Sequence, residues 1–335
     1  MDSSSTPSPA GVTVSFAPDE PATLLRLEQV VHASVYLGAM AYGLHLTTFF
    51  NAMKAILSDA EKRHWKWIPF VGSTFLLGTI NIAALIRFNQ LAWIDDRNFP
   101  GGPVGFLLGQ QNTPANIISI ATAIIMIALG DSFLIVRCHA LWRNIYISAG
   151  LFALLIAAIV ISVLHFIQVV GVKTLSEDVL NLKFSIPFAT LVTALNVLIC
   201  LLLLWRIFDL RRRLPSDLND IAKRQFKSLE SVIIETAMPI GVLSFAFLML
   251  YIANSPGSIL VFPLLVQALG IMPSLIILRM MGGYAWSTRV LRTIGSSIVL
   301  RGQLGRTPGT NELSAISFNN AQFAHSLDLK NQTHP

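Results

Sequence analysis

The chain has 335 residues, of which 53% are hydrophobic and only 13% are charged. Soluble domains carry about 25% charged residues, so a chain with this composition lacks the polar surface of a water-soluble globule. Its mean hydropathy is +0.63, and its charged residues gather in short runs between long uncharged stretches. This pattern predicts a multi-pass membrane protein.

The net charge of +6 also fits a nucleic-acid-binding protein. Most Lys and Arg residues flank apolar runs, however, and this is typical of the cytoplasmic segments of membrane proteins. We therefore expect the lipid bilayer as the main partner and no nucleic acid. The two cysteines, Cys138 and Cys200, fall near predicted cytoplasmic helix ends, so we expect no disulfide between them.

Seven apolar segments have the length of membrane spans, since about 20 residues cross a hydrocarbon core of about 30 Å. They lie near residues 30–53, 67–88, 114–137, 145–169, 184–206, 232–253 and 259–279. The last two share one charge-free stretch, which the turn-forming residues 254–258 divide. The sequence thus predicts an all-α bundle of seven transmembrane helices.

The orientation of this bundle follows from its positive charges. Of the 24 Lys and Arg residues, all but five lie on one side of the membrane in this arrangement. The five exceptions are Arg26, Arg87, Arg97, Lys173 and Lys183. Because cytoplasmic segments are enriched in positive charge, we expect an outer N-terminus and a cytoplasmic C-terminus. We expect the plasma membrane rather than an internal membrane.

The segments outside the spans differ in composition. Residues 1–28 are rich in Ser, Pro and Thr and predict a disordered extracellular tail before a transmembrane domain at 29–280. Residues 281–301 predict an amphipathic helix in the membrane interface, and 302–335 predict a disordered cytoplasmic tail. The outer segment 89–113 is rich in Gly and Pro and predicts an irregular lid rather than a helix.

Two acids lie inside predicted spans, Asp131 in the third and Glu235 in the sixth. A charged group at membrane depth costs about 2.5–3.5 kcal/mol on insertion scales, so it usually faces the bundle interior with a partner. Three arginines, Arg137, Arg206 and Arg279, end spans on the same side. We hypothesise that these five residues form an inner polar network whose breakage opens the bundle, as in a switchable receptor. The alternative is that the acids are static contacts between helices.

Basic residues crowd the predicted inner loop at 206–231. They predict a docking site for a cytoplasmic partner or an anionic lipid, or they serve only to orient the protein. The polar span residues His45, Asn81, His165 and Asn196 predict hydrogen bonds between helices.

Motifs for chemistry are missing from the sequence. The seventh span contains no Lys for a retinal Schiff base, no two histidines stand four residues apart, and no Gly-rich phosphate loop or Gly-x-Ser-x-Gly segment occurs. We therefore expect neither an enzyme nor a bound cofactor or metal.

Four segments are distinctive as a set. They are Gly130 to Cys138 with Trp142 after it, Asn196-Val197-Leu198 leading to Arg206 and Arg211-Arg212-Arg213, Glu235-Thr236-Ala237, and Gly270 to Arg279. Over residues 30–280, their order resembles a large group of seven-span membrane proteins from mushroom-forming (basidiomycete) fungi. The resemblance implies seven spans and a fungal origin, and it implies no particular activity. Animal rhodopsin-like receptors differ, because their Asp and Arg in the third span are adjacent and their seventh span carries Asn-Pro-x-x-Tyr.

These features together favour a receptor-like or sensor protein. A transporter or scaffold for lipids or small apolar solutes is the first alternative, and an accessory membrane protein is the second.

Overall fold

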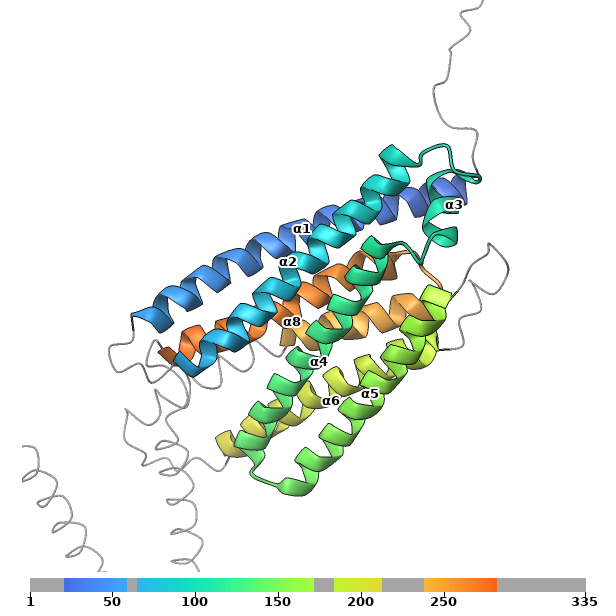
Figure 1. The fold of residues 1–335 in the computed structure, drawn as a ribbon. Helices are drawn as coiled ribbons and strands as arrows, with labels where there is room; N and C mark the ends of the chain where they lie inside the picture. The colour runs from blue at the N-terminus through green and yellow to red at the C-terminus, as the bar shows by residue number, and fades with distance from the viewer. Residues whose placement is uncertain (1–20, 59–64, 172–183, 213–237, 282–335) are drawn as a thin grey trace, which may run out of the picture. The chain divides into compact units, whose positions relative to one another are not determined.

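The computed structural model describes residues 21–58, 65–171, 184–212 and 238–281. Within those ranges every regular element is helical and no strand occurs. The elements are α1 (Ala22–Leu57), η1 (Trp65–Trp67), α2 (Ile68–Gln90), η2 (Leu91–Asp95), α3 (Gly102–Gly109), α4 (Pro114–Trp142), α5 (Ile145–Gly171), α6 (Ser185–Arg212), a helix at Met238–Ile252, and α8 (Gly257–Met281) (Figure 1). The described part of the chain is therefore all-α, as predicted.

Five helices are long and apolar enough to cross a membrane. They span Trp65–Asp95, Pro114–Trp142, Ile145–Gly171, Ser185–Asp209 and Gly257–Arg279, and each covers one of the predicted spans. The helix Met238–Ile252 is also apolar but shorter.

The first predicted span corresponds to α1, which has 36 residues. At 1.5 Å per residue its length is about 54 Å, more than enough to cross. It is not among the five most apolar helices, and its buried residues include the polar Ser34 and His45.

The start of α1 corrects the predicted tail. The helix begins at Ala22, whereas the sequence places a disordered tail up to residue 28. Residues 22–28 contain Ala, Leu, Arg and Glu, which are strong helix formers, and the carbonyl of Pro21 accepts the Leu24 amide at 2.9 Å. The remaining tail residues and the predicted amphipathic helix at 281–301 lie almost wholly outside the described residues.

The segment between α2 and α4, predicted as an outer lid, is also different from its prediction. It is folded, with η2 continuing α2 and with the two-turn helix α3. Gly101 has φ 84° and begins α3, and an added Cβ at Gly105 would lie 2.3 Å from the Pro100 carbonyl oxygen. The glycines that suggest an irregular lid are therefore the residues that permit a compact turn. Apolar burial also holds α3 in place, through the cluster of Phe88, Ala92, Phe106 and Leu107.

The helices pack closely at small residues. α1 lies along α8 and α2, and α4 contacts α2, α5 and α8 (Figure 1). A Cβ at Gly38 of α1 would lie 3.1 Å from the Pro263 side chain of α8, and one at Gly130 of α4 would lie 3.0 Å from Leu269. α8 continues through both of its interior prolines, Pro263 and Pro273. Small residues that let backbones approach are typical of helix contacts in membranes.

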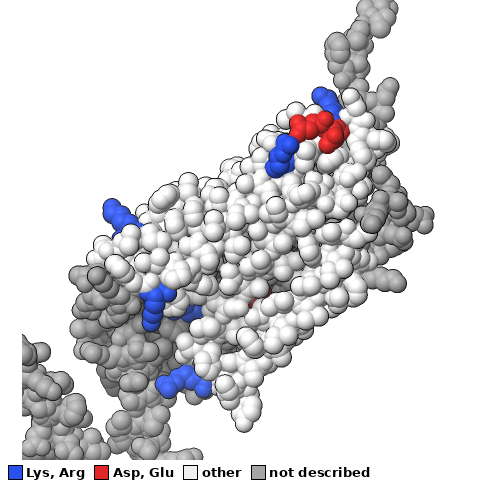
Figure 2. All heavy atoms as spheres, viewed as in Figure 1, with Lys and Arg blue, Asp and Glu red and all other residues white. Residues whose placement is uncertain are grey.

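The outer faces of the helices are apolar. On α5, for example, Phe152, Ile156 and Val160 recur every four residues and are each about half exposed. Figure 2 shows charged side chains at two ends of the helical unit with a broad uncharged region between them. An exposed apolar band bounded by charge is expected of a protein surrounded by lipid.

Two units divide the chain by their internal contacts. One, Met1–Phe208 with Lys227–Ala285, contains the helices that concern the candidate site. The other, Asp209–Phe226 with Trp286–Pro335, lies almost wholly outside the described residues.

Candidate functional site

Arg137, predicted as a member of the inner network, is held by aromatic rings. Its guanidinium carbon lies 4.7 Å from the centroid of Phe133 and 5.7 Å from that of Trp67. Phe133 in turn stacks on Phe70 of α2 at 5.3 Å. The side chain is only 9% exposed, and cation–π contacts are stronger where water is excluded. Arg137 therefore joins the end of α4 to the start of α2.

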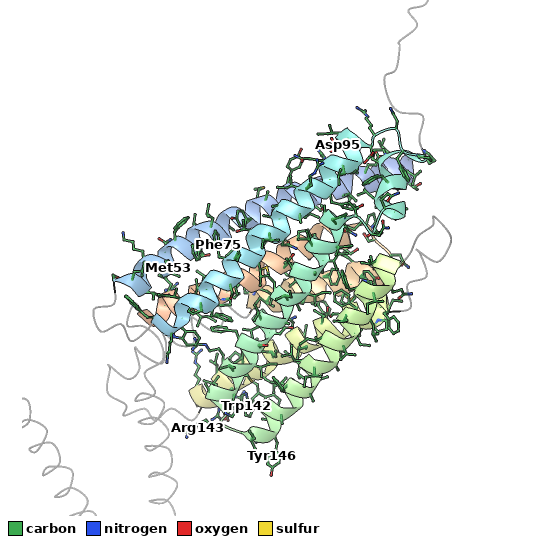
Figure 3. All side chains as sticks on the ribbon, in the orientation of Figure 1. Met53, Phe75, Asp95, Trp142, Arg143 and Tyr146 are labelled. Atoms are coloured by element: carbon green, nitrogen blue, oxygen red, sulfur yellow. The ribbon has the colours of Figure 1, made fainter. Side chains whose placement is uncertain are left out.

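Arg206 joins α6 to the end of α4. Its Nε donates to the Leu141 carbonyl at 3.2 Å, and its guanidinium lies over the Trp142 ring at 5.3 Å. Trp142 completes the contact, because its Nε1 donates to the Leu202 carbonyl at 3.1 Å. Trp142 and Arg143 lie at one end of the helical unit, with Asp95 at the other (Figure 3). We call this reciprocal contact of Leu141, Trp142, Leu202 and Arg206 the α4–α6 clasp.

Asp131 does not join the arginines. The residue is 0% exposed, and neither of its carboxyl oxygens has a hydrogen-bond partner. Asp131 and Arg137 are six residues apart on α4, which separates them by about 9 Å along the axis and about 120° around it. The sequence places both on the inner half of one helix, but helical geometry turns them to different neighbours. Asp131 thus contacts Asn196 rather than Arg137, and the five-residue network as a whole remains a prediction.

The side chain that faces Asp131 is Asn196 of α6. Asn196 is also 0% exposed. Its Nδ2 donates to the Val192 carbonyl of its own helix at 3.0 Å, and its Oδ1 has no partner. One turn further along α6, Cys200 also lies near Asp131 and packs against Gly241 of the helix Met238–Ile252, where an added Cβ would lie 3.0 Å from Sγ. Asp131 thus lies where α4 meets α6. Cys200 connects this position to the helix of the sixth predicted span.

The other two members of the network remain predictions. Glu235 lies outside the described residues. Arg279 is exposed near the end of α8, and its side chain interacts with other groups. The 206–231 loop is described only as far as residue 212.

The interhelical hydrogen bonds predicted for span residues are confirmed at three positions. Asn81 of α2 donates to the Ser119 carbonyl of α4 at 2.8 Å. His165 of α5 lies 3.3 Å from the Ser185 hydroxyl of α6. His45 joins α1 to α8. At Asn196, the side-chain Nδ2 donates within α6, to the Val192 carbonyl.

His45 is the centre of a contact among three helices. Gln267 Nε2 of α8 donates to the Gly78 carbonyl of α2 at 3.3 Å, which turns its Oε1 to His45 Nδ1 at 3.0 Å. Nδ1 is therefore the donor in this pair. The imidazole is 0% exposed, and two glycines make room for it, since a Cβ at Gly78 or Gly270 would lie 2.9 Å or 2.5 Å from ring atoms. Sequence reasoning missed Gln267, although a glutamine inside a charge-free stretch is itself a signal of such a contact.

The first part of α1 and the end of α2 share a second polar contact that the sequence does not single out. His32 lies 2.9 Å from the Tyr36 hydroxyl and 3.3 Å from the Asn89 side-chain amide. Nearby, Arg87 and Asp95 form an ion pair at 2.8 Å, with side chains 54% and 42% exposed. These contacts connect the segment between α2 and α4 to the bundle. The α4–α6 clasp joins two helices at the opposite end of the bundle.

Cys138 and Cys200 form no disulfide with each other, as predicted, and both are buried. Among the described residues, no three His, Cys, Asp or Glu side chains come together as a metal site.

Comparison with known proteins finds no relative: no protein-family model, no curated protein and no solved structure matches the chain.

Proposed function

We propose that this protein is a receptor-like or sensor protein of the plasma membrane, with seven spans, an outer N-terminus and a cytoplasmic C-terminus. The observation that carries the proposal is the contact between Asp131 and Asn196. The two side chains are wholly buried and face each other between α4 and α6, and Oδ1 of Asn196 has no hydrogen-bond partner. A buried acceptor without a donor costs about 1–3 kcal/mol. This cost raises the free energy of the described packing and so narrows its difference from a second packing in which these groups are satisfied. A receptor needs two packings of similar free energy.

The remainder of the bundle supports this division into a fixed part and a moving part. α1, α2, α4 and α8 are joined by satisfied polar contacts at Asn81 and Gln267 and by close glycine packing. Buried side-chain atoms without a hydrogen-bond partner occur in both groups, at His45, Asn89 and Ser274 in the first and at Asn196 and Ser244 in α6 and the helix Met238–Ile252. The difference lies in the contacts that join the first four helices. We infer that α6 and the helix Met238–Ile252 move against the fixed part.

The α4–α6 clasp is the second element of the proposal. It holds the predicted cytoplasmic end of α6 against α4 in the packing described here. Opening it would move the basic 206–231 loop, to which a cytoplasmic partner or an anionic lipid would bind. The excess of positive charge on that side of the predicted spans supports the orientation.

Guanine-nucleotide exchange on fungal G proteins, in membranes containing the protein, tests the proposal. Asp131→Asn replaces a buried carboxyl by a neutral amide that still pairs with Asn196, so we expect it to favour the described packing and to lower exchange. Trp142→Phe removes the indole N–H from the clasp, so we expect higher exchange. Asn81→Ala is the control, because it breaks a contact within the fixed part and leaves the switch intact.

Opposite effects of Asp131→Asn and Trp142→Phe, with Asn81→Ala unchanged per folded molecule, would support a receptor. Equal exchange in all four proteins, each shown to be folded and inserted, would refute coupling to G proteins. A transporter or scaffold for lipids or small apolar solutes would instead show transfer activity in liposomes.

A further inference from the structure

Positive charge is segregated at one end of the helical unit. On the face drawn in Figure 2, that end shows only basic side chains, whereas the opposite end shows acids beside bases. At the opposite end, Arg87 pairs with Asp95 at 2.8 Å. At the basic end, Lys54 of α1 and Lys66 of η1 are both exposed, and within the described residues no carboxylate pairs with either lysine. These two cations are therefore accessible to an anion from outside the chain.

The packing of Trp67 brings the two lysines to one corner of the bundle. Trp67 lies against a buried cluster from α1, α2 and α8, made of Ala52, Ile56, Val71 and Ile277. Lys54 lies on α1 between the two members of the cluster that α1 contributes. Lys66 precedes Trp67 in η1, which contacts α1. We call Lys54, Lys66 and Trp67 together the Trp67 corner.

A third cation adds to the positive potential at this corner. Lys66 Nζ lies 5.8 Å from the centroid of the Trp67 ring, and the guanidinium carbon of Arg137 lies 5.7 Å from the same centroid. Two like charges beside one ring repel each other, and a negative group next to them lowers that repulsion. Since Arg137 is only 9% exposed, direct contact with an outer anion falls to the lysines.

Exposed aromatic side chains lie at the same end of the bundle. They are Trp65 in η1, Tyr146 in α5 and Trp205 in α6. Figure 3 shows Tyr146 and Met53, the residue before Lys54, on the side of the bundle opposite to Asp95. Tryptophan and tyrosine prefer the headgroup region of a bilayer. The aromatic residues therefore place the Trp67 corner at the level of lipid headgroups.

We propose that the Trp67 corner binds the headgroup of an anionic phospholipid. Lysine ammonium groups bind phosphate as point charges, and basic clusters between helices bind anionic headgroups. The acyl chains of the lipid would lie along the apolar outer face of α1, where Phe50 is exposed one turn from Lys54. A soluble phosphate has the same charge but makes no such apolar contact. This site is separate from the 206–231 loop, and the inference holds whether or not the protein is a receptor.

Tryptophan fluorescence of the purified full chain tests the site. The chain is reconstituted into phosphatidylcholine bilayers that contain either brominated phosphatidylserine or brominated phosphatidylcholine. Bromine quenches nearby indoles, so the two lipids report their relative affinity for sites beside the tryptophans. We expect phosphatidylserine to be preferred, and we expect the preference to fall about 5-fold in Lys54→Gln and in Lys66→Gln. Arg97→Gln is the matched control, because it removes one exposed charge at the opposite end, and it should leave the preference unchanged.

Four outcomes would overturn the proposal. The first is equal quenching by the two lipids in the wild type, and the second is a preference that survives when both lysines are replaced. The third is an equal loss in Arg97→Gln, which would mean that net charge attracts the lipid. The fourth is loss of the preference when inorganic phosphate is added at constant ionic strength, which would identify a soluble anion as the ligand. Both lysines are exposed, so the variants should fold, and a readout of lipid contact distinguishes failure here from failure of the receptor proposal.

Discussion

A methyl group added at Gly270 tests the packing around His45. In Gly270→Ala, the new Cβ would lie 2.5 Å from His45 Cε1 and 2.7 Å from Met126 Cε. The methionine end is flexible and moves at low cost. The imidazole is held by Gln267 at 3.0 Å, so it cannot turn away without breaking that bond. Overpacking of this kind typically costs about 1–3 kcal/mol.

Gly43→Ala is the matched control, because Gly43 lies on the same bundle with nothing within 4 Å of its added Cβ. Both variants gain the same helix propensity, about 1 kcal/mol relative to glycine, so their difference isolates the clash. We expect Gly270→Ala to unfold at a lower temperature than Gly43→Ala in nanodiscs. His45→Ala should reduce the penalty of Gly270→Ala in a double-mutant cycle, because the obstructing ring is then absent. Equal melting of Gly270→Ala and Gly43→Ala would refute the close approach of α1 and α8.

Three further predictions concern other contacts. Gly105→Ala should disrupt α3, because the added Cβ would lie 2.3 Å from the backbone oxygen of Pro100; limited proteolysis of the outer segment should then be faster than in the wild type. Asp95→Asn should change the free energy of unfolding by less than about 1 kcal/mol, since its ion pair with Arg87 is half exposed, and a larger loss would mean that the pair is shielded from water. Gln267→Leu should cost about 1–3 kcal/mol, because it leaves the buried imidazole donor on α1 unsatisfied and removes the hydrogen bond to the Gly78 carbonyl of α2; a melting temperature equal to that of the wild type would contradict the three-helix contact.

The helices were predictable because composition and hydrophobicity determine them locally. The start of α4 at Pro114 and that of α5 at Ile145 coincide with the predicted spans, since a span must be about 20 apolar residues long. The turn at residues 254–258 is also present, with Asn254 at φ 49°. Such signals lie in a short stretch of sequence.

The errors came from contacts between segments. The sequence shows glycines between residues 89 and 113, but not that Gly105 lies against Pro100 and allows α3 to pack. It likewise shows Asp131 and Arg137 on one helix, but not which neighbour each one faces. Asp131 faces Asn196, which is 65 positions away in the chain, and Arg137 faces aromatic rings. Pairings at that separation depend on the packing of whole helices, which no local pattern specifies.

The distance between the ends of α4 and the helix Met238–Ile252 tests the proposed switch most directly. Spin labels at Arg143→Cys and Met238→Cys report it, because both positions are exposed whereas the native Cys138 and Cys200 are buried. We predict two distances for the labelled protein. Asp131→Asn should enrich the shorter one and Trp142→Phe the longer one. A single distance, the same in all three proteins, would contradict a bundle that moves at α6 and the helix Met238–Ile252.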